Sequence, residues 1–114
     1  NIPTATVADS IYVDEPRNGA HALKKLKNNG GRIIKVSDDQ IIEAQSDLSS
    51  TAGLFTEPAG STAWAGFKKA ADEIEKDAVV VIMATGNGLK DTTTALKGIH
   101  MPEKSISSID EILK

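Results

Sequence analysis

An unbroken apolar run, Val-Val-Val-Ile-Met-Ala at residues 79–84, leads directly into Thr-Gly-Asn-Gly at residues 85–88. A short apolar run rich in β-branched residues favours a buried strand, and two closely spaced glycines indicate a tight turn behind it. In open α/β sheets, ligands bind beyond the carboxyl ends of the strands. The pattern therefore predicts a buried strand over residues 78–84 that carries Thr85 to the rim of a sheet, where it would border a binding site.

Two further apolar segments, at residues 11–13 and 32–36, also have the composition of strands. Apolar residues elsewhere recur at helical spacing, and Ser37 followed by Gln40 is the pattern of a capping box. The predicted helices cover residues 18–28, 37–53, 58–74, 89–97 and 106–113. Because strands and helices alternate, we predict an α/β fold in three layers, with a mostly parallel sheet flanked by helices. Three strands are few for such a sheet, so we expect this chain to be a piece of a longer protein.

The composition argues against several classes of partner. With 13 basic and 16 acidic residues, the 114-residue chain has a net charge of -3, which provides no electrostatic attraction to nucleic acid or to an anionic membrane. No apolar run approaches the ~20 residues of a membrane span. The absence of cysteine excludes disulfides and thiolate chemistry, and it favours a cytoplasmic protein. His21 and His100 lie far apart with no ligand pattern near either, so we predict no metal site.

Two motifs resemble a known enzyme family. Glu-Pro-Ala-Gly at residues 57–60 opens a helix rich in small residues, and the later apolar run ends in Thr-Gly-Asn-Gly-Leu-Lys-Asp at residues 85–91. This order resembles the C-terminal part of threonine synthases, which belong to the fold type II enzymes that use pyridoxal phosphate. The resemblance extends over residues 9–97. Its second motif is fairly specific for threonine synthases, whereas threonine and serine dehydratases share the first.

The resemblance implies that residues 1–114 form a single piece, the C-terminal part of the large domain that binds pyridoxal 5'-phosphate. In that family the catalytic lysine and the phosphate-binding loop lie upstream, outside this chain. The resemblance therefore implies that no residue here is catalytic, Lys90 included. The loop at residues 86–88 is expected to be a structural turn, although its backbone could also form an anion-binding nest.

The resemblance also implies two cofactor-binding residues, each with an alternative. Thr85 would donate a hydrogen bond to the pyridine nitrogen of the cofactor, because a hydroxyl can donate to a neutral ring nitrogen whereas a carboxylate would keep it protonated. Alternatively, Thr85 only ends a strand and bonds backbone groups. Glu57 lies in the loop that the resemblance places beside the cofactor ring. Alternatively, it is a carboxylate stabilised by a helix N-terminus, an effect worth ~0.3–1 kcal/mol.

The function implied is that of a lyase in threonine biosynthesis, which converts O-phosphohomoserine and water to threonine and phosphate. The full-length protein is expected to be a cytoplasmic homo-oligomer, and the fragment alone is expected to be inactive. Three alternatives remain open: a threonine or serine dehydratase of the same fold, a cofactor-binding module without catalysis, and a scaffold or interaction domain.

Overall fold

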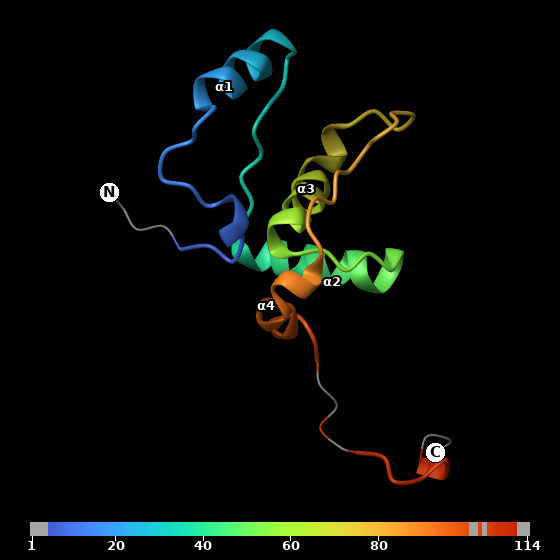
Figure 1. The fold of residues 1–114 in the computed structure, drawn as a ribbon. Helices are drawn as coiled ribbons and strands as arrows, with labels where there is room; N and C mark the ends of the chain where they lie inside the picture. Colours follow the sequence, from blue (N-terminus) through green and yellow to red (C-terminus); the bar gives the residue numbers. More distant parts are fainter. Residues whose placement is uncertain (1–4, 101–102, 104, 112–114) are drawn as a thin grey trace.

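The computed structural model describes residues 5–100, 103 and 105–111, which fold into helices joined by long extended connections (Figure 1). The four α-helices are α1 (Gly19–Asn28), α2 (Asp38–Ala52), α3 (Pro58–Ala70) and α4 (Thr92–Lys97). The short 3₁₀ turns are η1 (Asp9–Ile11), η2 (Ala71–Glu73), η3 (Gly88–Lys90) and η4 (Ile109–Glu111).

The packed centre of the molecule is the pair α2 and α3, which cross each other in Figure 1. The facing side of α3 consists mainly of small residues, and these allow the two helix axes to approach closely. The buried residues of α2 are Ile41, Ala44, Gln45 and Leu48, and those of α3 are Pro58, Ala59, Gly60, Ser61, Ala65, Gly66 and Ala70. At the rim of this contact, Lys68 of α3 pairs with Glu43 and Asp47 of α2 at 2.6 and 2.5 Å.

The start of α2 confirms the predicted capping box. The amide of Gln40 donates to Ser37 Oγ at 3.3 Å, and the amide of Ser37 donates to Gln40 Oε1 at 2.9 Å. The helix ends at Gly53, whose φ of +66° lies in the left-handed region that glycine adopts without strain. Both ends of α2 are therefore set by residues within a few positions of them, which is why the sequence predicts this helix well.

The three-layer, mostly parallel sheet is not confirmed. Across the described ranges there is no strand, and the only ladder contact is an isolated antiparallel bridge between Thr56 and Asn87. The segments predicted as strands are 11–13, 32–36 and 78–84, and none of them pairs with a neighbouring strand in the described structure. Ile11 is instead the last residue of η1. A single extended segment has no partner for its backbone amides and carbonyls, so it cannot form a strand by itself.

The predicted buried strand over residues 78–84 is therefore corrected. Val79, Val81 and Met83 have exposed fractions of 94%, 83% and 71%, because neither a neighbouring strand nor a second helical layer covers them among the described residues. Such a solvent-exposed apolar run is unusual for a folded protein and marks a surface suited to contact with more polypeptide.

The remaining helices differ from the predictions at their ends. The helix predicted over residues 18–28 forms as α1 (Gly19–Asn28) with Asn18 as its N-cap. It is exposed or half-buried throughout and stands apart from α2 and α3 (Figure 1). The predicted helix over 58–74 ends at Ala70, and the one over 89–97 divides into η3 and α4 at Asp91, whose carboxylate accepts from the amide of Thr94 at 2.9 Å. Of the predicted 106–113 helix, the described residues 106–111 form only η4, and residues 112–113 lie outside the described part of the chain.

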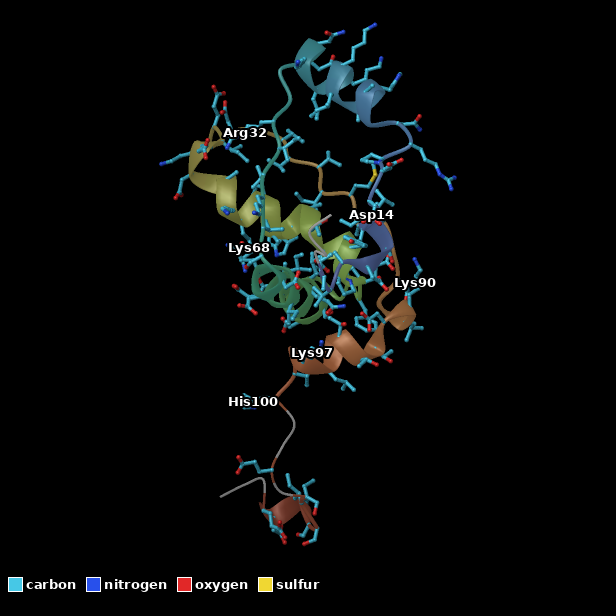
Figure 2. All side chains as sticks on the ribbon, turned by 90° about the vertical axis from the view of Figure 1, so that its left-hand side faces the viewer. Asp14, Arg32, Lys68, Lys90, Lys97 and His100 are labelled. Carbon is cyan, nitrogen blue, oxygen red and sulfur yellow. The ribbon has the colours of Figure 1, made fainter. Side chains whose placement is uncertain are left out.

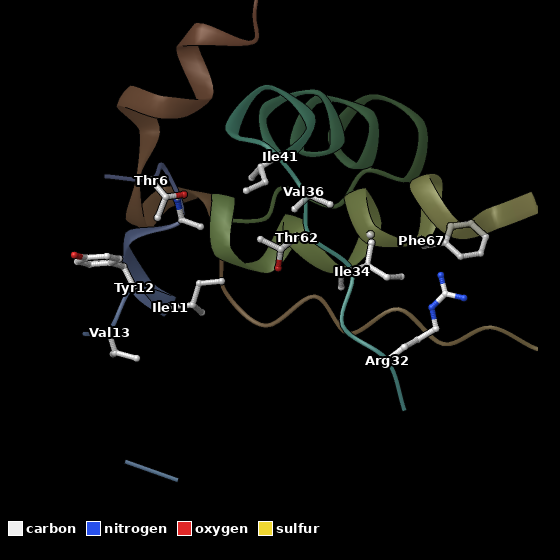
Figure 3. Close-up of a pocket in the computed structure, with 13 residues that line it drawn as sticks. Thr6, Ile11, Tyr12, Val13, Arg32, Ile34, Val36, Ile41, Thr62 and Phe67 are labelled. Atoms are coloured by element: carbon white, nitrogen blue, oxygen red, sulfur yellow. The ribbon is translucent and has the colours of Figure 1, made fainter. Parts of the chain in front are cut away.

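An open groove of about 630 Å³ separates the N-terminal segment, the 32–36 segment and α3. Figure 3 shows Ile11, Ile34 and Val36 around it, with Thr62 and Phe67 contributed by α3. The radius of gyration, 18.0 Å, exceeds the ~13 Å expected for a globular domain of this length. Both facts reflect extended segments that pack only in part against the α2–α3 pair, as Val36 does against the cluster that contains Ile41 and Ala59.

Candidate cofactor-binding site

The loop that follows the apolar run folds back onto the start of α3. The amide of Glu57 donates to the carbonyl of Gly86 at 2.9 Å, and the amide of Gly88 donates to the carbonyl of Phe55 at 2.9 Å. These bonds flank the bridge between Thr56 and Asn87. The two sequence motifs, at residues 57–60 and 85–91, are therefore in direct contact although a whole helix separates them in the chain.

Glycines make this close approach possible. A Cβ on Gly86 would lie 1.9 Å from Glu57 Oε1, and a Cβ on Gly88 would lie 2.5 Å from the Phe55 ring. On the other side of the contact, a Cβ on Gly60 would lie 3.3 Å from the amide nitrogen of Thr85. The Gly-Asn-Gly spacing is thus required by two specific contacts, and the first turn of α3 backs directly onto Thr85.

The Asn87 side chain has a local role in the same loop. Its Oδ1 accepts a hydrogen bond from the amide of Leu89 at 2.9 Å, which caps the start of η3. This bond closes a tight turn within the chain itself. The geometry agrees with the structural-turn interpretation of residues 86–88.

Thr85 lies exposed at a hollow of about 460 Å³ lined by residues 53–56 and 84–87. Within the part of the chain that the structure describes, no hydrogen bond involves its hydroxyl. A free hydroxyl beside an open hollow suits the ring nitrogen of a planar cofactor, since it can donate one hydrogen bond there. The residues present therefore fit the cofactor contact that the resemblance implies for Thr85.

Glu57 has a buried carboxylate that does not cap its own helix. It is the N-cap residue of α3, yet in the described chain its carboxylate accepts no hydrogen bond from the first amides of that helix. Its side chain is 6% exposed, and Oε2 accepts from Ser10 Oγ at 3.1 Å and lies 2.9 Å from Lys90 Nζ. The Glu57 carboxylate is thus engaged with two other segments, and Glu57 is not among the residues that line the hollow at Thr85.

A buried polar network holds the connection between α2 and α3, residues 53–57, in place. Gln45 Nε2 donates to the carbonyl of Thr56 at 2.7 Å, and the hydroxyls of Thr56 and Ser61 lie 2.6 Å apart. Ser61 Oγ also donates to the carbonyl of Glu57 at 3.1 Å. Sequence analysis missed these residues, although a glutamine on the apolar stripe of a helix is a signal that could have indicated a buried partner.

The ion pair between Glu57 and Lys90 makes the free energy of unfolding depend on pH. The hydrogen bond from Lys90 lowers the pKa of the Glu57 carboxyl below its ordinary 4.5, burial opposes this, and the bond from Ser10 assists it. Because the folded-state pKa is the lower one, this stabilisation is fully present above pH 4.5 and is lost as the pH falls through the folded-state pKa. We expect the free energy of unfolding, measured with urea, to fall more steeply below pH 4.5 for the wild type than for Glu57→Gln. Parallel curves for the two proteins would contradict this.

A metal centre and a membrane span are not found among the described residues. Within them, no group of three or more histidine, cysteine, aspartate or glutamate side chains is arranged to hold a metal ion. None of the described helices has the length and apolar character to cross a membrane. His100, which Figure 2 places beyond α4, is exposed, as is His21.

Comparison with known proteins identifies the family to which this chain belongs. Residues 2–86 match the sequence model of the family described as pyridoxal-phosphate dependent enzyme. This chain belongs to that family, and the resemblance noted from the two motifs is confirmed.

Threonine synthases are among the relatives. The chain is 38% identical to that of Methanocaldococcus jannaschii over 87% of its own length and 25% of the relative. It is 38% identical to that of Halalkalibacterium halodurans, with 84% and 28% covered, and 35% identical to that of Mycobacterium tuberculosis, with 94% and 30% covered. The chain thus spans about a quarter to a third of the length of these relatives.

Proposed function

We propose that this chain is part of a threonine synthase, a pyridoxal phosphate-dependent lyase that converts O-phosphohomoserine and water to threonine and phosphate. Similarity to threonine synthases extends over 84–94% of the chain. The motif at residues 85–91, which resembles that of threonine synthases, lies against the motif at residues 57–60 through the bond between the Glu57 amide and the Gly86 carbonyl. This contact between the two motifs is the observation that carries the proposal.

The chain is proposed to be the C-terminal part of the large cofactor-binding domain. The catalytic lysine and the loop that binds the cofactor phosphate would then lie elsewhere in a longer polypeptide. The exposed segments 11–13, 32–36 and 78–84 would become strands of a mostly parallel, three-layer sheet once other parts of that domain pair with them. Their exposed apolar residues, such as Val79 at 94%, support this reading. The complete protein is proposed to be a cytoplasmic homo-oligomer.

Within the site, Thr85 is proposed to donate its hydroxyl hydrogen to the pyridine nitrogen of the cofactor. When bound, pyridoxal phosphate supplies an electron sink for the amino-acid substrate. A hydroxyl at the ring nitrogen leaves that nitrogen unprotonated, whereas a carboxylate would favour its protonation. Glu57 is proposed as the second residue at the cofactor through the position of its loop beside the ring, because its carboxylate is paired with Ser10 and Lys90 instead of facing the hollow.

A dehydratase of the same fold is the second candidate, because the Glu-Pro-Ala-Gly motif at residues 57–60 is shared with threonine and serine dehydratases. Such an enzyme would release a keto acid and ammonia from threonine or serine. The Leu-Lys-Asp ending at residues 89–91 favours the synthase. A cofactor-binding module without catalysis would be favoured only if the longer polypeptide carried no lysine at the cofactor.

An assay of products separates these candidates. We expect the native polypeptide that carries these residues to release phosphate and threonine in equal amounts from O-phosphohomoserine, and to form little keto acid from threonine. The isolated 114-residue chain should release neither product, since the proposed catalytic lysine lies outside it. Keto acid from threonine without phosphate release would support the dehydratase. Threonine made by the isolated chain would contradict the proposal that the catalytic lysine lies outside it.

A further inference from the structure

Glu57 and Lys90 form an ion pair whose two members differ in their environment. The Glu57 side chain is 6% exposed and that of Lys90 is 60% exposed, with Nζ and Oε2 2.9 Å apart. Figure 2 shows Lys90 beside η1, the turn that also supplies Ser10 to the same carboxylate. An exposed pair contributes little to stability, but removing the cation here would leave a buried carboxylate with one neutral donor. Lys90 is therefore more than a solvated surface charge.

Glu57 holds the loop after Thr85 at two points. Its backbone amide binds the carbonyl of Gly86, which directly follows Thr85, and its carboxylate binds Lys90 at the end of η3. Both ends of the loop formed by residues 86–90 are therefore bound to the same residue, Glu57. The first turn of α3 lies against the near end of this loop, since a Cβ on Gly60 would come within 3.3 Å of the Thr85 amide nitrogen.

We propose that Lys90 is a positioning residue for the cofactor site, which closes the 86–90 loop on Glu57 and thereby holds the Thr85 hydroxyl at its hollow. The inference rests on the proposed function, because Thr85 is the proposed contact to the ring nitrogen. Lys90 itself touches no cofactor in this account. The charge of Lys90 holds the Glu57 carboxylate. The loop in turn positions Thr85 through the backbone of the next residue, Gly86.

Hydrogen exchange of the full 114-residue chain tests the loop closure without any cofactor. The variants are Lys90→Gln, which removes the charge, Lys90→Arg, which keeps it, and Lys76→Gln as an exposed lysine control. We expect the exchange of the Glu57 and Gly88 amides, relative to that of Ala44 in α2, to rise about tenfold in Lys90→Gln. Lys90→Arg and Lys76→Gln should match the wild type. Wild-type exchange in Lys90→Gln, or equal loosening in Lys90→Arg, would overturn the proposal.

A double variant keeps the test decisive if Lys90→Gln folds poorly. In Glu57→Gln the buried charge is absent, so adding Lys90→Gln should change the loop exchange little, and the double variant should be more stable than Lys90→Gln alone. A double variant as unstable as Lys90→Gln would contradict an action through Glu57.

The consequence for Thr85 is read from the cofactor absorbance of the native polypeptide. Lys90→Gln should displace the absorbance maximum in the same direction as Thr85→Ala, and Lys90→Arg should restore it. A loosened loop with an unchanged maximum would overturn the positioning role while leaving the proposed function intact. If the wild type showed no cofactor absorbance, the proposed function would fail and the exchange result would still report on the loop.

Discussion

Replacing Gly86 by alanine is expected to destabilise the chain by about 2–3 kcal/mol. The new Cβ would lie 1.9 Å from Oε1 and 2.2 Å from Cδ of Glu57. That carboxylate is buried and held by Lys90 and Ser10, so it has little freedom to move aside. Relief of the overlap must break the ion pair or pull the loop off α3. The quantity to measure is the free energy of unfolding, from urea titrations followed by the helical circular dichroism signal.

Gly66→Ala is the matched control for this prediction. Gly66 lies inside α3, and a Cβ there would meet only Ile34 Cβ, at 3.9 Å, which is an ordinary contact. Alanine is favoured over glycine in a helix by ~1 kcal/mol, so this variant should be neutral or slightly stabilised. If the two variants had equal stabilities, Gly86 would not be constrained by Glu57 as described.

Replacing Thr85 by aspartate is expected to lower kcat of the native polypeptide about 100-fold. In the proposed contact, a carboxylate at the ring nitrogen would favour the protonated ring, whereas the hydroxyl would leave it neutral. The exposure of Thr85 at an open hollow is the observation that supports this contact. The direct measurement, alongside kcat, is the ¹⁵N chemical shift of the labelled ring nitrogen in wild type and variant.

Two further substitutions of Thr85 separate the effect of the added charge from the effect of the lost hydroxyl. Thr85→Ser keeps the hydroxyl and should retain most of the activity and the wild-type ring-nitrogen shift. Thr85→Ala removes the donor without adding a charge, so its activity should fall by less than that of the aspartate variant. A Thr85→Asp protein with wild-type kcat and an unchanged nitrogen shift would show that Thr85 does not contact the ring.

Helices were predictable where their determinants are local. Ser37 and Gln40 lie three residues apart and bond each other as the capping box requires, and Gly53 ends the same helix. The sheet was not predictable for this chain, because pairing depends on polypeptide that lies beside a strand rather than on the strand itself. Val79 has the residue type of a buried strand and is 94% exposed, since nothing among the described residues covers it.

The site shows the same division between local and distant causes. The sequence indicated Thr85 and Glu57 and the glycines of a tight turn, because motif and turn chemistry depend on residue type. It did not indicate that Lys90 pairs with Glu57, because that contact needs the loop to fold onto α3. By residue type alone Lys90 is a candidate catalytic group, whereas its geometry gives it a buried partner, Glu57.

The proposed cofactor site is tested most directly by the visible absorbance of the native polypeptide that carries these residues, recorded before and after treatment with borohydride. We expect a yellow protein whose visible band borohydride abolishes, since the cofactor would be bound through a lysine elsewhere in the same domain. We also expect Thr85→Ala to displace this band. A colourless protein that stays colourless when pyridoxal phosphate is added would contradict the account, and Thr85 would then be no more than the end of an extended segment.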